Sequence, residues 1–255
     1  MNLTTLCERY DDRLRTADYA SIDASANGLQ VGPAEQSIEH VAFAVDAVAE
    51  TASLAAEAGA DLLVTHHGLS WGGIERVTGR QYGRIAPLVR NDVALYVSHL
   101  PLDGHQELGN AAGLADLLEL TDRRPFADLG GEFIGQRGTA SEPYATDELA
   151  ALLEAELDHG GAGVQVLDFG PDEIEAVAIA TGAGADALDD AVAAGADALV
   201  TGEGKGRLYH EAREADLNVF LAGHYATETF GVRALRSLTA EWGLETSYLD
   251  VPTGL

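Results

Sequence analysis

The arrangement of apolar and polar positions predicts a strand, a helix and a second strand in the first third of the chain. Residues 41–47 form a β-rich apolar run, and residues 49–59 place apolar side chains at helical spacing. Residues 60–68 form another apolar run, which ends in Thr-His-His-Gly. Two buried strands joined by a helix of this length indicate a βαβ unit.

The same pattern returns later in the chain, with a strand, a helix and a strand at residues 175–182, 186–195 and 196–204. Residues 41–68 align with residues 177–204 without a gap, and 14 of the 28 aligned positions are identical. Seven of these identities are Ala, but both copies also share the order Gly-Ala-Asp-x-Leu-Val-Thr, which joins a helix end to a strand. We interpret the repeat as an internal duplication.

Two further strands run into polar loops at residues 93–103 and 218–228, and helices are expected after them at residues 107–120 and 227–243. An offset of 125 residues pairs His99 with His224 and Asp103 with Glu228. Residues 130–169 favour a strand, a helix and a strand that open the second half.

Strands that alternate with helices predict an α/β fold with largely parallel sheets flanked by helices. We expect two similar halves, residues 1–124 and 125–255, related by a pseudo-twofold axis. Functional sites of such folds lie at the carboxyl ends of strands. Five residues fall at strand ends, so we predict that the two halves jointly hold one site: His66, His67, Asp103, His224 and Glu228.

The composition fits a chain that buries a core, since 46% of its 255 residues are apolar. The N-terminal segment is charged where a signal peptide would be apolar, and no run approaches the roughly 18 apolar residues of a membrane span. Cys7 is the single cysteine, which excludes intrachain disulfides and cysteine-based metal sites. We therefore expect a soluble protein of the cytoplasm, with no membrane partner.

Acidic residues far outnumber basic ones, 42 against 15, and the formal net charge is −27. Lys205 is the only lysine. The acids are spread over helices and loops, which favours a solvated surface of the halophile type over a site for a cationic partner. Free nucleic acid is not expected as a partner, because phosphate contacts need clusters of Lys and Arg.

Three histidines and two carboxylates are ligands that suit Zn, Mn, Fe, Co or Ni. Adjacent histidines within a strand would point to opposite faces, so we expect His66 and His67 to lie just past the strand, in a turn that Gly68 permits. Five protein ligands suit two divalent ions roughly 3.5–4 Å apart, and such a pair activates water. Hydrolysis is the reaction class that this set of ligands supports.

Each of these residues also has a structural interpretation. The histidine pair could be hydrogen-bonded loop residues, His224 and Glu228 could mark a solvated helix start, and Asp103 could be an N-cap. Their common position at strand ends favours the metal site. His99 is predicted to orient a ligand or, like Glu203, to carry protons.

A glycine-rich turn at residues 181–186 follows a strand and opens a helix. The amides of Gly182 and Gly184 could bind a phosphate group there. A tight strand-to-helix turn explains the same glycines equally well.

Several motifs together resemble those of the YbgI-like, or NIF-three-like, family of dinuclear metal-centre proteins, many of which are called GTP cyclohydrolase 1 type 2 homologues. They are Asn-Gly-Leu-Gln-Val-Gly at 27–32, Thr-His-His-Gly at 65–68, Ser-His-Leu-Pro-Leu-Asp at 98–103, Thr-Gly-Glu-Gly at 201–204 and Ala-Gly-His-Tyr-Ala-Thr-Glu at 222–228. The resemblance covers nearly the whole chain. It implies a ring-shaped homohexamer and two α/β domains with a metal pair in the cleft between them. The ligands of this pair would be His66, His67, Asp103, His224 and Glu228.

The sequence therefore leads to two alternative predictions of function. The first is a metal-dependent hydrolase that acts on a phosphate-bearing or nucleotide-like small molecule, with two divalent metal ions per chain. The second is a non-catalytic oligomer that binds metal or a protein partner through the same ligands.

Overall fold

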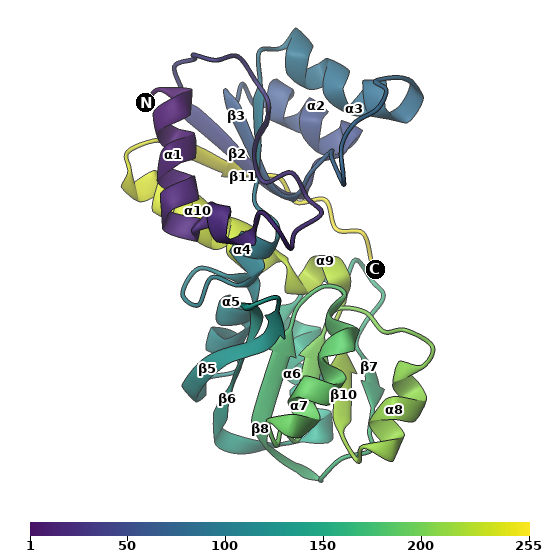
Figure 1. The fold of residues 1–255 in the computed structure, drawn as a ribbon. Helices are drawn as coiled ribbons and strands as arrows, with labels where there is room; N and C mark the ends of the chain where they lie inside the picture. Colours follow the sequence, from purple (N-terminus) through teal and green to yellow (C-terminus); the bar gives the residue numbers. More distant parts are fainter. The chain divides into compact units, whose positions relative to one another are not determined.

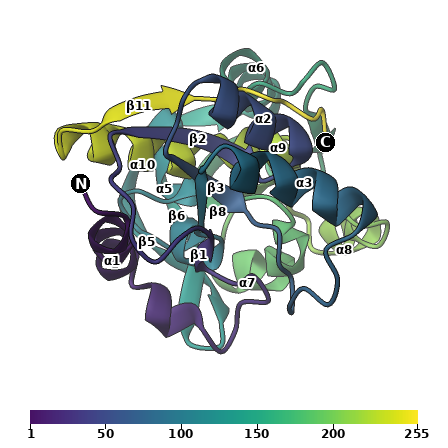
Figure 2. The same ribbon diagram turned by 90° about the horizontal axis from the view of Figure 1, so that it is seen from above.

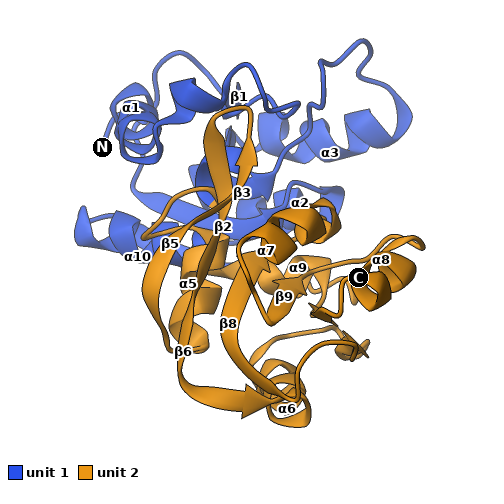
Figure 3. Cartoon of the chain, turned by 60° about the horizontal axis from the view of Figure 1, so that its bottom comes forward, with its two compact units in different colours: residues 1–102, 231–251 blue, residues 103–230, 252–255 orange.

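The computed structural model describes residues 1–255, which form two compact units (Figure 3). Unit 1 comprises Met1–Leu102 and Gly231–Val251, and unit 2 comprises Asp103–Phe230 and Pro252–Leu255. Each unit is a sheet with helices on both faces, so the predicted α/β fold class is confirmed. None of the helices has both the length and the apolar character that a membrane span requires.

The sheet of unit 1 has five strands in the order β1-β4-β3-β2-β11. They are β1 (Gly28–Val31), β2 (His40–Asp46), β3 (Leu62–His67), β4 (Ala94–Val97) and β11 (Glu245–Tyr248). All pairs are parallel except β1 with β4. The central strands are buried on both faces, which is why they appear in the sequence as continuous apolar runs.

Helices α2 (Ala49–Glu57) and α3 (Gly79–Arg90) cover one face of this sheet (Figures 1 and 2). Ala52 and Ala55 of α2 and Leu88 of α3 share one core with side chains of β2, β3 and β4. The small alanine side chains let α2 pack close to the strands.

Helices α1 (Leu3–Leu14) and α10 (Thr229–Glu241) cover the other face, and the short 3₁₀ helix η1 (Thr16–Tyr19) follows α1. Apolar side chains at helical spacing, including Leu3, Leu6 and Tyr10, form the buried stripe of α1. The ring of Tyr10 lies 5.0 Å from that of Tyr96 in β4, and its hydroxyl is 2.6 Å from the hydroxyl of Thr239 in α10. These contacts join both helices to the sheet.

The sheet of unit 2 has six strands in the order β5-β6-β8-β9-β10-β7. They are β5 (Leu120–Leu129), β6 (Glu132–Ala145), β7 (Gln165–Leu167), β8 (Glu173–Ala180), β9 (Ala198–Thr201) and β10 (Asn218–Leu221). Only β8, β9 and β10 pair in parallel, while the outer strands pair antiparallel. The expected strand–helix–strand at residues 130–169 is β6, α6 (Thr146–Glu156) and β7.

Two cores flank this sheet. Helices α5 (Asn110–Leu117) and α6 pack on one face, and α7 (Leu188–Ala193) and α8 (Leu208–Glu214) pack on the other. The helix expected at residues 186–195 is divided into the 3₁₀ helix η2 (Gly184–Ala187) and α7.

The internal duplication is visible in the strand register. Val41 of β2 faces Leu62 of β3, and Val177 of β8 faces Ala198 of β9. Both partners are displaced by 136 residues, which is the offset at which the sequence repeats. The two parallel pairs are therefore copies of one βαβ unit.

The next strand after each repeat, β4 in unit 1 and β10 in unit 2, does not show the expected offset of 125 residues. Ala94 faces Leu62, and Asn218 faces Ala198, so β4 and β10 correspond at an offset of 124. The short helices after them, α4 (Leu100–Asp103) and α9 (His224–Thr227), correspond at the same offset. The expected offset of 125 is thus wrong by one residue.

As a consequence, His99 corresponds to Gly223 and Asp103 corresponds to Thr227. Matching residue chemistry, rather than backbone position, produced the pairing of His99 with His224 and of Asp103 with Glu228. The two copies therefore place their histidines differently with respect to the strand ends.

The unit boundary also differs from the predicted division into residues 1–124 and 125–255. Position 124 lies inside β5, which pairs with β6 in unit 2. The last strand, β11, pairs with β2 in unit 1, because the chain returns to the first sheet after α10. Unit 1 is therefore built from two separate segments of the chain.

Candidate metal centre

His66 and His67 are the last two residues of β3, and not part of a turn beyond it as the sequence analysis expected. Their ring centroids are nevertheless only 4.6 Å apart. His66 is fully buried, and its Nδ1 is 3.0 Å from the carbonyl oxygen of Ser98. Because a carbonyl can only accept, Nδ1 carries the proton and Nε2 carries the lone pair that a metal ligand needs.

Gly68 follows the two histidines because of close packing against another side chain, and not because it forms a turn. A Cβ at this position would collide with the side-chain amide of Gln30. That amide accepts a hydrogen bond from the backbone N–H of Leu69 at 2.8 Å. Because Gly68 has no side chain, there is room for the amide of Gln30, whose hydrogen bond with Leu69 fixes the chain directly after the two histidines.

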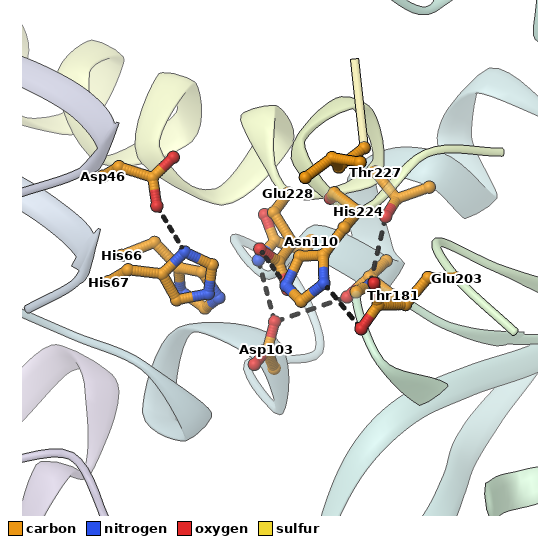
Figure 4. A network of polar contacts seen from close by, with 12 residues as sticks. Asp46, His66, His67, Asp103, Asn110, Thr181, Glu203, His224, Thr227 and Glu228 are labelled. Carbon is orange, nitrogen blue, oxygen red and sulfur yellow. Dashed lines mark hydrogen bonds and ion pairs between the residues drawn. The ribbon is translucent and has the colours of Figure 1, made fainter. Parts of the chain in front are cut away.

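A carboxylate orients the second histidine. Asp46, the last residue of β2, lies beside His67 in the strand register, and its Oδ1 is 2.9 Å from His67 Nδ1 (Figure 4). An imidazole held in this way keeps a fixed ring orientation and becomes a better ligand. The sequence analysis missed Asp46, although its position at the end of a buried strand is the signal that identified the histidines.

His99 joins the pair within unit 1. Its ring centroid lies 5.1 Å from that of His66 and 5.7 Å from that of His67. The ligand atoms of the three histidines lie within 4.8 Å of one another, so they could hold a metal ion. The edge of Trp71, a half-exposed residue, packs against His99 at 4.9 Å.

Asp23 holds His99 in place. Its side chain is 1% exposed, and its Oδ1 is 2.9 Å from His99 Nδ1. It also accepts hydrogen bonds from the backbone N–H groups of Ser25 and Leu100 and from the amide of Asn27. Burial alone would raise the pKa of Asp23, but the hydrogen bond and charge of His99, together with the other donors, hold it below its usual value.

Asn27 completes this arrangement by accepting the backbone N–H of His99 at 2.7 Å. Both Asn27 and Gln30 belong to the segment Asn-Gly-Leu-Gln-Val-Gly, whose motif was noticed in the sequence without a role for either side chain. Their partners are 39 and 72 residues away, so sequence spacing alone could not reveal these roles.

In unit 2, Asp103 is the last residue of α4 and is only 8% exposed. Its Oδ1 accepts a hydrogen bond from the Asn110 amide at 2.8 Å and from the Thr181 hydroxyl at 3.3 Å (Figure 4). Asp103 therefore does not act as the N-cap of α5, whose N-cap is Gly109. Its carboxylate is buried, polar and oriented, as a metal ligand would be.

His224 and Glu228 contact each other across one helical turn. His224 opens α9 directly after β10, and its Nε2 is 3.2 Å from Glu228 Oε2. Glu203, after β9, approaches the opposite nitrogen, with its Oε1 3.4 Å from Nδ1 (Figure 4). Glu228 is 3% exposed and the His224 side chain is 27% exposed, so a buried carboxylate pairs with a partly buried histidine and the two do not form a solvated helix start.

Burial would lower the pKa of His224, but the hydrogen bond and charge of Glu228, followed by the charge of Glu203, raise it to about 9. The ring therefore holds a proton at neutral pH when no other cation is near. A metal ligand must be a neutral imidazole, so a divalent ion that binds here displaces this proton.

Gly182 and Gly184 have packing roles around this pair. Gly182 has a φ of +58°, and a Cβ there would collide with Glu228 and lie 3.0 Å from His224 Nε2. A Cβ on Gly184 would lie 2.6 Å from that of Ala180. The phosphate-binding role of both glycines stays a prediction, and the close approach of the strand-to-helix turn is a sufficient reason for their presence.

Each unit thus presents a set of nitrogen and oxygen donors, most of which follow or end its parallel strands, while Asp103 lies in α4 after β4. Unit 1 contributes three imidazoles, two of them oriented by carboxylates. Unit 2 contributes a buried Asp103 and the pair of His224 with Glu228. Imidazole and carboxylate ligands without thiolate suit Zn, Mn, Fe, Co and Ni, and the residues present fit such ions.

The whole chain is similar to one family of proteins. The family model for Duf34/NIF3 (NGG1p interacting factor 3) matches residues 1–253. A Halobacterium salinarum protein named GTP cyclohydrolase 1 type 2 homolog is 59% identical over 255 residues, which cover 100% of both chains. A Deinococcus radiodurans protein of the same name is 41% identical over 239 residues, 91% of this chain and 88% of the relative.

Solved structures share the fold. The protein ybgI, described as of unknown function, superposes with a TM-score of 0.91 at 35% identity, and the match covers 100% of both chains. A Thermus thermophilus protein superposes with a TM-score of 0.89 at 38% identity, again over 100% of both chains. Sequence and fold therefore agree over the full length, and the chain belongs to the Duf34/NIF3 family.

Proposed function

We propose that His66, His67, Asp103, His224 and Glu228 bind two divalent metal ions per chain. The observation that carries the proposal is that buried nitrogen and oxygen donors gather at strand ends in both units and are oriented by second polar groups. Such orienting contacts, as from Asp46 to His67 and from Asn110 to Asp103, are typical of metal ligands. Five protein ligands suit two ions better than one.

We further propose that the protein is a metal-dependent hydrolase of a phosphate-bearing or nucleotide-like small molecule. When bound, a pair of divalent ions supplies Lewis acidity and lowers the pKa of water, which is the chemistry that hydrolysis needs. The name of the relatives, GTP cyclohydrolase 1 type 2 homolog, supports nucleotides as the first substrates to try.

Two side chains would carry protons in this reaction. His99 is held by Asp23, which fixes which nitrogen carries its proton. Glu203 has a side chain that is 53% exposed and lies against His224, so it can exchange protons with solvent. Either group could deliver a proton to a leaving amine or receive one from water.

Metal analysis of the purified protein tests the first proposal. About two ions per chain are expected, with a clear loss of metal in His66→Ala and in His224→Ala. His210→Ala is the matched control, because His210 is an exposed histidine of α8. A protein that takes up no metal even after reconstitution would overturn the proposal.

Activity assays with a panel of nucleotides and cyclic amides, in metal-loaded protein, test the second proposal. Turnover that disappears in the two ligand variants but persists in His210→Ala is expected. Bound metal without turnover of any member of the panel would instead favour the non-catalytic metal-binding oligomer. The homohexamer and the cytoplasmic location stay predictions from resemblance and composition.

A further inference from the structure

A cavity of about 260 Å³ lies within unit 2, at the carboxyl ends of β9 and β10. Its walls come from the segment after α6, from the turns after both strands and from the last residues of the chain. The residues that the argument uses are His159, Gly202, Glu203, Gly204, Leu221 and Gly223. No Lys or Arg is among the lining residues.

His159 is the informative member of this wall. It is only 7% exposed, and its Nε2 is 3.0 Å from the carbonyl oxygen of Leu153. Because that carbonyl can only accept, Nε2 carries the proton of the neutral ring, and Nδ1 is left as an acceptor. Nδ1 is buried and has no hydrogen-bond partner. Buried polar atoms are nearly always paired, so a missing donor is expected at this position.

Glycine keeps the space beside this nitrogen open. Gly223 has a φ of +89°, and a Cβ there would lie 3.4 Å from His159 Nδ1. Gly204 packs against Leu221 on the same wall, since its Cβ would lie 2.9 Å from that side chain. Backbone surfaces without side chains and one aliphatic wall suit a flat ring.

The second acceptor is the carboxylate of Glu203, which also contacts His224 at 3.4 Å. The cavity therefore offers the acceptors of His159 and Glu203 beside the amide of Gln165, has no Lys or Arg in its lining, and lies next to a proposed metal ligand. Such a lining disfavours a phosphate group and favours a neutral group that donates hydrogen bonds.

We propose that this cavity binds the uncharged nitrogen-containing ring of the substrate, a heterocycle or cyclic amide whose N–H groups donate to His159 Nδ1 and to Glu203. The identification of this ring with the substrate rests on the proposed hydrolase function, whereas the binding of the ring does not. The phosphate end of the same molecule would lie outside the cavity.

Two neutral probes of equal shape test the proposal. Benzimidazol-2-one has two N–H donors, and indan-2-one, in which CH2 groups replace both N–H groups, has none. Binding is measured by NMR titration of the full-length protein, once after treatment with EDTA and once after loading with Zn²⁺ or Mn²⁺. The donor-bearing probe is expected to bind at least tenfold more tightly than indan-2-one.

His159→Leu removes the buried acceptor and should weaken binding of benzimidazol-2-one at least fivefold, while His210→Leu, at an exposed histidine of α8, should leave it unchanged. If His159→Leu does not fold, Glu203→Leu decides the question, because Glu203 lies in an exposed loop and the same weakening is expected. Equal binding of the two probes, or unweakened binding in a folded variant, would overturn the proposal.

The two proposals fail in distinguishable ways. Binding to the EDTA-treated protein that depends on His159 supports the cavity even if metal analysis finds no ions. Two ions per chain together with no preference for the donor-bearing probe would support the metal site and overturn the cavity.

Discussion

Two aspartates, Asp23 and Asp46, each accept a hydrogen bond from the ring of a histidine in unit 1. Asp23 is the more deeply buried of the two, with a side chain that is 1% exposed against 29% for Asp46. A buried carboxylate is stable only when donors compensate for its lost hydration. Asp23 therefore stabilises the fold as well as orienting His99.

Substituting Asp23→Asn should lower the free energy of unfolding by about 2–3 kcal/mol at neutral pH, because charge-assisted hydrogen bonds are lost and a donor replaces an acceptor. The folded-state pKa of Asp23 lies below its unfolded value of about 4. Its stabilisation is thus present above about pH 4 and is lost as the pH falls through the folded-state pKa.

Urea unfolding of the original protein and of Asp23→Asn, between pH 7 and pH 3, measures this effect. The difference between them should shrink as the pH falls below about 4. Asp18→Asn serves as the control, since Asp18 forms an exposed ion pair with Arg15 and should cost less than about 1 kcal/mol. A constant difference across the pH range would contradict the role given to Asp23.

Gly182→Ala tests the packing around His224 and Glu228. Alanine at a φ of +58° costs about 1–2 kcal/mol in the backbone, and its Cβ must also displace Glu228. We expect lower stability and weaker metal binding, measured by urea unfolding and by competition with a chelator. Gly83→Ala is the matched control in α3, where a Cβ meets nothing within 4 Å, and it should stabilise the helix by about 0.5–1 kcal/mol.

The sequence identified residues whose role follows from their immediate neighbours, and it missed residues whose partners lie far away along the chain. His66 and His67 end a continuous apolar run, so their position at the carboxyl end of a strand was predictable. Asp23 and Asn27 follow no strand, and they reach His99 only because the chain brings together segments more than 70 residues apart. No local pattern encodes that approach.

At the level of secondary structure, the predictable elements were those whose apolar residues form a continuous run or recur at helical spacing. The buried strands β2 and β3 and the helix between them were placed within a few residues, because parallel strands bury both faces. The strand β11 was missed, since Glu-Thr-Ser-Tyr has no apolar run and only half-buried side chains. Edge strands of this kind are defined by their partner, and the partner of β11 lies about 200 residues earlier.

The position of β11 at the sheet edge leads to a test with proline. The backbone N–H of Glu245 donates to Glu39, just before β2, and that of Leu249 donates to Phe43 in β2. Because N–H directions alternate along a strand, the N–H of Ser247 also points toward β2, and that of Thr246 points away from it. Ser247→Pro should therefore destabilise unit 1 by about 2 kcal/mol more than Thr246→Pro.

The Ser247 hydroxyl also lies 2.9 Å from His40 Nε2, so Ser247→Ala is needed to isolate that contact. Urea unfolding of the three variants separates the side-chain and backbone contributions. Equal destabilisation by the two prolines would show that β11 does not pair with β2 as described.

For the whole molecule, the dominant physical property is the net charge of −27. Repulsion among surface carboxylates opposes the folded state and weakens as salt shortens the screening length.

We expect the Tm to rise steadily as KCl increases from about 0.1 M to about 2 M, where the Debye length falls to a few ångströms. Thermal unfolding followed by circular dichroism measures it, with sucrose as a control for effects that do not involve charge. A Tm that does not depend on KCl would remove the link between surface charge and stability.

The return of the chain to the first sheet affects how the protein is made. On the ribosome, the strands β1 to β4 emerge early, but α10 and β11 follow only after residues 103–230 have been synthesised. Until then the nascent sheet has an unpaired edge at β2 and lacks the helix that meets Tyr10. Multidomain chains usually fold from the N-terminal end. In this protein the order is reversed for the sheets, because all strands of the second sheet have been synthesised at Leu221, whereas the first sheet gains its last strand only at Tyr248. The first sheet therefore waits for almost the entire polypeptide.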